Sequence, residues 1–148
     1  MCLRLYPYET PETATKIASE DITCYKILKG YNPINNEVFI SLYQDFKYVI
    51  GEKYQNKGLG FHFRLGSADY STPDIYEVYE AFHSFKHEET TLFELDELSK
   101  QRYSKIVAVK CTIPKGSKYV ENDAFYASDT IIIDKIIGEY QNKMKIII

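Results

Sequence analysis

The sequence predicts an α+β domain in which a mostly antiparallel sheet of about seven strands packs against one or two helices. Three observations predict this class. Runs rich in β-branched and aromatic residues recur along the chain, turn residues separate them at hairpin length, and only one long segment has helical spacing. Because no linker divides the sequence, residues 1–148 are expected to form a single domain.

The first half of the chain is expected to contain one short helix, around residues 13–19, and several strands. Gly, Pro and Asn separate the strands, in loops at 29–37 and 67–74 and in a turn at 56–60. The expected strands cover residues 22–28, 38–42, 47–50 and 61–65, with a short extended segment near 53–54.

The second half contains the clearest helix and the clearest strand. Leucines recur every three residues in 87–101, acids lead and bases follow, as the helix dipole favours. In 105–113 the apolar residues Val107, Val109, Cys111 and Ile113 alternate, which predicts one buried strand face. A tight turn at 114–117 follows. Residues 75–85, 118–121 and 130–137 are expected to complete the sheet.

Charge and cysteine content exclude several classes of function. The chain has 18 basic and 21 acidic residues, a net charge of −3, and no dense basic cluster, so nucleic-acid binding is not expected. No secretory leader or apolar run of membrane length occurs, which predicts a cytoplasmic protein of a bacterial host cell. Three cysteines do not indicate a disulfide framework, although Cys24 and Cys111 could meet as buried apolar residues on neighbouring strands.

No catalytic or metal-binding constellation is evident in the sequence. His62 and His83 lie inside aromatic strands, His83 and His87 would share no helix face, and no cysteine is near them in sequence. Ser84 follows His83 directly, but adjacent strand residues point to opposite faces. We therefore expect no metal, no cofactor and no catalytic residue, and the interpretation as an enzyme is not favoured.

Tyrosine is the one excess in the composition, with 14 Tyr and 8 Phe in the chain. If several of the strand tyrosines line one cleft beside a basic side chain, they would suit a nucleobase and its phosphate. The alternative is that these rings belong to the core and the sheet surface. The candidate ligand-binding residues are Tyr25, His62, Arg64, His83 and Lys110.

Two resemblances bear on function. The segments AFHSF at 81–85, IVAVKCTIPKGSKYV at 106–120 and YASDTIIIDKI at 126–136 resemble a group of small uncharacterised proteins of bacteriophages and gut Bacteroidota. The valine-rich strand and its IPKG turn also resemble ADP-ribosyltransferase-like domains. However, the late strands offer only Asp134 where those enzymes need a paired carboxylate.

The leading hypothesis is a small, soluble, non-catalytic binding protein of phage or mobile-element type. It would sequester a nucleotide-derived ligand that serves as a signal in host defence. The alternatives are a protein-interaction or structural module, such as a virion component or an inhibitor of a host enzyme, and an ADP-ribosyltransferase-like enzyme. Homo-oligomerisation is compatible with each.

Overall fold

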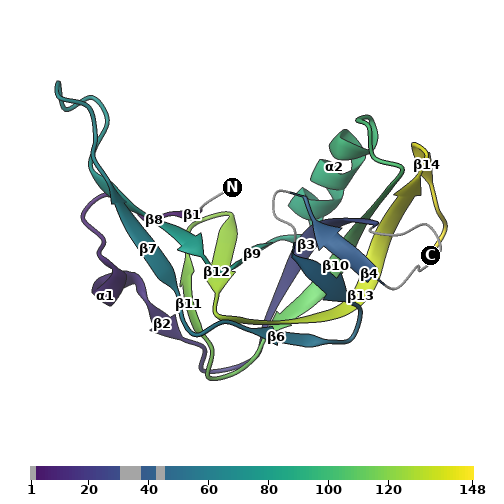
Figure 1. The fold of residues 1–148 in the computed structure, drawn as a ribbon, viewed down its shortest axis with the longest axis horizontal. Helices are drawn as coiled ribbons and strands as arrows, with labels where there is room; N and C mark the ends of the chain where they lie inside the picture. The colour runs from purple at the N-terminus through teal and green to yellow at the C-terminus, as the bar shows by residue number, and fades with distance from the viewer. Residues whose placement is uncertain (1–2, 31–37, 43–45) are drawn as a thin grey trace.

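A computed structural model describes residues 3–30, 38–42 and 46–148 as two antiparallel sheets and two helices (Figure 1). The smaller sheet has the order β1-β8-β7, with strands β1 (Leu3–Arg4), β7 (Gly60–Arg64) and β8 (Ile75–Glu80). The larger sheet contains eleven strands: β2 (Lys16–Ile17), β3 (Ile22–Gly30), β4 (Val38–Ser41), β5 (Lys47–Val49), β6 (Lys53–Gln55), β9 (Phe82–Phe85), β10 (Lys105–Ile113), β11 (Lys118–Glu121), β12 (Phe125–Ser128), β13 (Thr130–Gln141) and β14 (Met144–Lys145). The helices are α1 (Pro11–Ala14) and α2 (Glu88–Ser99).

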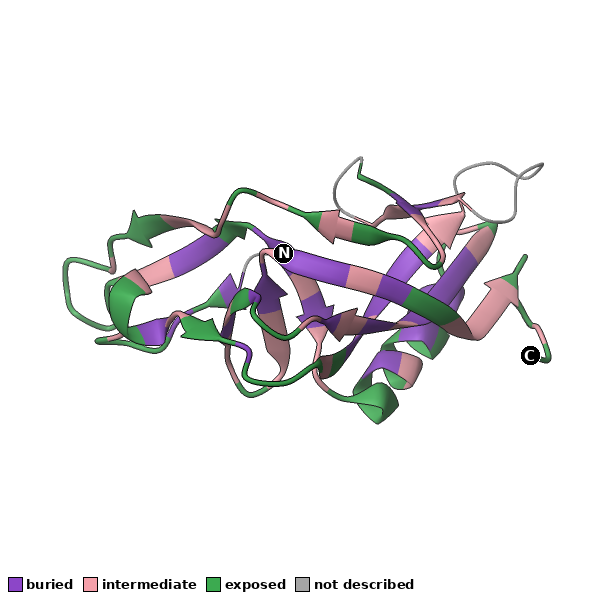
Figure 2. Ribbon diagram, turned by 90° about the horizontal axis from the view of Figure 1, so that it is seen from below, coloured by how far each residue is buried: buried purple, intermediate pink, exposed green. Residues whose placement is uncertain are grey.

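The centre of the larger sheet is the antiparallel trio β13-β10-β3. Strand β10 matches the prediction for 105–113, and its alternating residues Val107, Val109, Cys111 and Ile113 pack in one core cluster with residues of β3 and β13. The intervening residues face the other side, where Ile106 and Ala108 contact α2. Figure 2 shows buried residues concentrated along these strands and on one side of α2. The period-two pattern therefore predicted the face formed by Val107, Val109, Cys111 and Ile113, and the structure also buries Ile106 and Ala108 on the opposite face.

Helix α2 confirms the helix predicted at 87–101, and its leucines pack against the larger sheet. Leu95 and Leu98 are buried against Ile27, Ile106 and Ala108. A side chain at position 138 would collide with Leu95 and Leu92, because a Cβ there would lie 2.9 Å from a Leu95 methyl carbon and 3.1 Å from a Leu92 methyl carbon. Gly138 thus permits the close approach of α2 to β13.

Four predictions need correction. The fold class is α+β and antiparallel, but the strands outnumber the seven expected, because several two- to four-residue strands pair at the sheet edges. The short helix is α1, earlier than 13–19: Thr10 caps it and Pro11 starts it, while residues 16–17 pair with β11. The loop at 29–37 begins later, since Lys29 and Gly30 belong to β3, and its residues 31–37 lie outside the described residues.

The fourth correction concerns residues 75–85, which form two strands instead of one. Strand β8 pairs with β1 and β7 in the smaller sheet, whereas β9 pairs with β12 and β3 in the larger one. The chain changes sheets at Ala81, a buried residue that packs beneath the smaller sheet. This switch places β9 beside β3 and so creates the candidate site. Within the described residues, no helix is long and apolar enough to cross a membrane.

Candidate functional site

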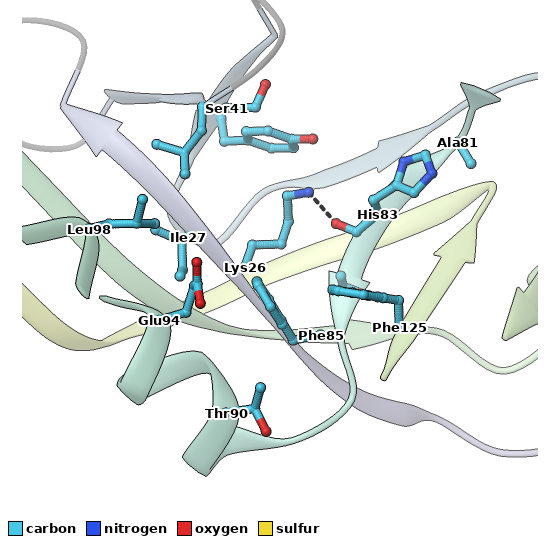
Figure 3. Close-up of a pocket in the computed structure, with 13 residues that line it drawn as sticks. Lys26, Ile27, Ser41, Ala81, His83, Phe85, Thr90, Glu94, Leu98 and Phe125 are labelled. Carbon is cyan, nitrogen blue, oxygen red and sulfur yellow. Dashed lines mark hydrogen bonds between the residues drawn. The ribbon is translucent and has the colours of Figure 1, made fainter. Parts of the chain in front are cut away.

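A cavity of about 410 Å³ opens where the larger sheet splits (Figure 3). Strand β3 pairs with β9 only at Tyr25 and Phe85, and with β4 only from Leu28 onward. In the described residues, the edge of β3 at Lys26 and Ile27 therefore has no strand partner on this side. Strands β3 and β9 diverge from the single Tyr25–Phe85 pair, and the cavity lies in the space between these two strands.

Most of the cavity wall is apolar or aromatic. Strands β3, β4, β5, β9 and β12, together with α2, supply it. The apolar lining residues are Ile27, Leu42, Tyr48, Ala81, Phe85, Leu98 and Phe125, and the polar ones are Lys26, Ser41, His83, Ser84, Thr90 and Glu94. In Figure 3 the carboxylate of Glu94 lies on the α2 side, near Ile27 and Phe85. A small number of polar groups in an apolar wall is typical of small-molecule sites.

Among the residues that the structure describes, Lys26 is the only lysine or arginine that lines this cavity, and it is buried. Its Nζ donates a hydrogen bond to the main-chain carbonyl oxygen of His83, which Figure 3 shows as a dashed line, and lies 5.4 Å from the centre of the Tyr48 ring. None of the ion pairs formed by the described residues includes Lys26. Burial lowers the pKa of this ammonium group below its ordinary value because the charged form loses its hydration.

His83 presents a neutral ring at the same wall. Burial, reinforced by the charge of Lys26, lowers the pKa of His83 to about 4. Its Nε2 lies 3.1 Å from the carbonyl oxygen of Val78, so Nε2 carries the proton and donates it there. The other ring nitrogen, Nδ1, is then a hydrogen-bond acceptor. On the same cavity wall, burial raises the pKa of Tyr48 above its ordinary value, so its phenol is protonated at neutral pH.

Among the described residues, His83 and Ser84 provide polar groups at the site but do not form a nucleophile–base pair. As the sequence predicted, Ser84 and His83 occupy opposite faces of β9, and the Ser84 hydroxyl is buried without a hydrogen-bond partner among the described residues. The His83 ring contacts a main-chain carbonyl instead of a hydroxyl or thiol. Nucleophilic catalysis of the serine–histidine type requires a hydrogen bond between the histidine ring and the nucleophilic hydroxyl or thiol. What the wall can do is hold an apolar body beside one buried cation.

The five predicted ligand-binding residues lie in three separate places. His83 lines the cavity. Tyr25 and Lys110 are cross-strand partners on β3 and β10, outside the cavity lining. His62 and Arg64 lie on β7 in the smaller sheet, where both contact Glu77. The structure therefore does not bring the five together as one cleft.

The tyrosines are also dispersed. Among the tyrosines expected in or beside strands were Tyr43 and Tyr48: Tyr48 lines the cavity, and Tyr43 lies outside the described residues. Phe46, Tyr48, Tyr54 and Phe82 form a cluster of edge-to-face and tilted rings, with ring centres 4.8–6.4 Å apart. In that cluster, Tyr54 accepts a hydrogen bond from the main-chain nitrogen of Val49. These rings mainly build the core.

Lys26 is the site residue that the sequence reasoning missed, although a signal was present. In strand 22–28 the residues Cys24, Lys26 and Leu28 lie on the same face, and Cys24 and Leu28, on either side of the lysine, are fully buried. A lysine on the buried face of a strand is unusual, because removing an ammonium group from water costs free energy. A charge at a core position of a strand is thus the pattern that could have identified the site.

Comparison of the chain with protein-family models, with curated proteins and with solved structures finds no match in any of the three.

Proposed function

We propose that the protein is a non-catalytic binding protein, and that its ligand is a small molecule with a planar apolar body and one anionic group. The ligand would occupy the cavity between β3 and β9, with its anionic group near Lys26. One observation carries this proposal: a buried lysine without a carboxylate partner among the described residues lies in the wall of an apolar cavity.

The energetic argument concerns Lys26. Removing an ammonium group from water costs several kcal/mol, and one main-chain acceptor compensates only part of that cost. An anion beside Nζ would supply the missing charge in surroundings where electrostatic attraction is strong. A chain that retains such a group in the wall of a cavity is therefore well adapted to receive a negative charge.

The cavity also limits the size and charge of the ligand. Its volume lies within the range of about 300–1,000 Å³ that is common for small-molecule sites. The Phe85 and Phe125 rings offer faces for a planar group. Since Lys26 is the one lysine or arginine among the described residues of the wall, one negative charge suits the cavity better than a polyphosphate.

We extend the proposal to a nucleotide-derived ligand with one phosphate, in accord with the phage-type resemblance of the sequence. A nucleoside monophosphate or cyclic nucleotide combines a planar base with such a group. Sequestration of a signal of this kind would serve a phage or mobile element during host defence. Planar aromatic carboxylates are the comparison class, because they offer the same charge and shape without a sugar.

The test measures thermal shifts and binding isotherms with cyclic and linear nucleoside monophosphates and with aromatic carboxylates. At least one anionic planar compound should stabilise the protein, by about 2.7 kcal/mol at a hundredfold excess over Kd. Lys26→Met should weaken binding at least tenfold. The control Lys53→Met alters an exposed lysine of β6 and should leave affinity unchanged.

Two results would refute this function. Absence of a thermal shift with every compound would eliminate the cavity as a site for planar anions. Equal affinity in the Lys26→Met variant would eliminate the lysine as the recognition group. Mass spectrometry of the incubated ligand tests the non-catalytic part, because a chemically altered ligand would show that the protein is an enzyme.

A protein-interaction module is the second candidate, and the hairpin formed by β7 and β8 favours it. Around its loop Phe63, Leu65 and Tyr70 are exposed, and Tyr8 lies at the same groove as Phe63 and Tyr70. Exposed apolar groups that gather in one place are typical of protein interfaces. The Phe63→Ser, Tyr70→Ser double variant should lose a partner, or a self-association seen by light scattering, that the unaltered chain retains. Identical behaviour of both chains would reject this role.

A further inference from the structure

The outer face of the smaller sheet gathers three basic side chains around one acid. Arg4 of β1 and His62 of β7 both lie directly across from Glu77 of β8, one on each side. Arg64 lies two residues further along β7, which places it on the same face as His62. All four side chains therefore come from the three adjacent strands of the smaller sheet.

The contacts of Glu77 occupy both of its oxygens. Arg64 Nη1 lies 2.9 Å and Arg4 Nε 3.2 Å from Oε1, while His62 Nε2 lies 3.2 Å from Oε2. The Glu77 side chain is only 9% exposed, whereas those of Arg4 and Arg64 are 62% and 58% exposed. The carboxylate is thus covered, and the cationic groups face outward.

The cluster has an excess of positive charge. Two guanidinium groups face one carboxylate, which leaves a net charge of +1 before His62 is counted. Of the ion pairs among the described residues, those of Arg4 and Arg64 involve no acid except Glu77. The hydrogen bond from Arg64 helps to lower the pKa of Glu77, so the carboxylate stays ionised and holds both guanidinium groups in place.

The guanidinium groups also retain unused donors. Each carries five N–H groups, and the ion pair with Glu77 engages one nitrogen of each. Arginine side chains that are fixed side by side form a site for an oxyanion, because a phosphate can accept hydrogen bonds from both at once. The Tyr79 ring lies 5.2 Å from the His62 ring and is half exposed, which adds an aromatic surface beside the cluster.

From this geometry we infer a second binding site: Arg4, Arg64 and His62 bind a phosphate group, with Glu77 as the positioning residue. The phosphate is inorganic, or it is the terminal group of a small phosphorylated molecule whose planar part stacks on Tyr79. The inference does not depend on the function proposed above, because none of these residues lines the cavity between β3 and β9.

The test titrates inorganic phosphate into the protein at low ionic strength and follows the bound fraction by phosphorus NMR. Saturable binding is expected, and the Arg4→Gln, Arg64→Gln double variant should weaken it at least tenfold. Lys53→Gln removes an exposed positive charge elsewhere and should change affinity less than twofold. Lys26→Met should also leave phosphate binding at this site intact, which separates the two proposals.

Two further variants complete the design. Arg64→Lys keeps the charge but loses the forked donor, so an intermediate loss of affinity is expected even if the double variant unfolds. Phenyl phosphate should bind more tightly than inorganic phosphate, and Tyr79→Ala should abolish that advantage. Two results would show that the Tyr79 ring has no role and that the bound phosphate is inorganic. One is that phenyl phosphate binds no more tightly than inorganic phosphate. The other is that Tyr79→Ala changes the affinity for neither compound.

The source of the phosphate is resolved by a single-stranded oligonucleotide in the same assay. Tighter, strongly salt-dependent binding of the oligonucleotide would assign the arginines to a nucleic-acid backbone and overturn the small-ligand form of the inference. Phosphate affinity that is equal in the unaltered chain and the double variant, or an absence of saturable binding, would overturn the site itself.

Discussion

The ammonium group of Lys26 donates a hydrogen bond to the main-chain carbonyl oxygen of His83, and this bond joins β3 to β9 beyond their last paired residues. The lysine side chain thus takes the place of a ladder hydrogen bond at the split in the sheet. The same ammonium group provides the charge on which the proposed binding function depends.

Replacement of Lys26 by methionine should leave the fold intact. At pH 7 we expect the free energy of unfolding to change by less than about 2 kcal/mol, because the loss of a buried charge offsets the loss of its hydrogen bond. Urea denaturation, with circular dichroism to follow helix and sheet content, measures this change. Unfolding of the variant in buffer would mean that the lysine is required for the fold.

The pH dependence of that comparison follows from the lowered pKa of Lys26. Between its folded pKa and the ordinary value of 10.5, the unfolded chain binds more protons than the folded chain. The unaltered protein should therefore gain stability relative to the methionine variant as pH rises toward 10.5. Parallel stability curves for the two chains in this alkaline range would contradict the buried position of the ammonium group.

Acid should destabilise the protein through His83. Its pKa is about 4 in the folded chain and 6.5 in the reference state, so the unfolded chain takes up a proton first as pH falls. Stability should decrease by roughly 3 kcal/mol between pH 6.5 and pH 4 from this residue. Urea denaturation at several pH values measures this decrease. In the His83→Asn variant the stability should fall by roughly 3 kcal/mol less over this range than in the unaltered chain. The control His62→Asn, on the outer face of the smaller sheet, should show the same fall as the unaltered chain. A decrease of equal size in the His83→Asn variant would refute the assignment.

The sequence predicted the elements whose side chains repeat with a clear period. The alternation in β10 and the leucine spacing in α2 reflect burial against neighbours, and burial is what selects apolar residues at those positions. It also predicted that Cys24 and Cys111 could meet, and they are cross-strand partners. The local pattern was sufficient for β10 and α2 because burial of one face of a strand or helix determines the spacing of its apolar residues.

The split in the sheet and the site within it could not be predicted in this way. The cavity depends on the pairing of Tyr25 with Phe85, which are 60 residues apart, and on the change of sheet at Ala81. Neither leaves a periodic signal in residues 75–85, because the composition is strand-like on both sides of the change. Strand β12 was not predicted either.

The two cysteines at the centre of the sheet should be unreactive in the native protein. Cys24 and Cys111 are fully buried, and burial raises the pKa of the Cys111 thiol. In a Cys2→Ser background, a disulfide reagent should modify both thiols at least about 10³-fold more slowly in buffer than in urea, because modification requires unfolding. Rapid modification of either thiol in buffer would show that this part of the core opens without global unfolding.

Helix α2 should be held to the sheet chiefly by Leu95. This side chain is buried among Ile27, Ile106 and Ala108, so Leu95→Ala should lower the free energy of unfolding by about 2–5 kcal/mol. Phe93 is exposed on the same helix and serves as the matched control, because Phe93→Ala removes a larger side chain yet should cost no more than about 0.5 kcal/mol. Urea denaturation at pH 7 measures both values. If the two variants lose equal stability, α2 does not pack through Leu95, and Leu98 cannot be treated as a fixed wall of the cavity.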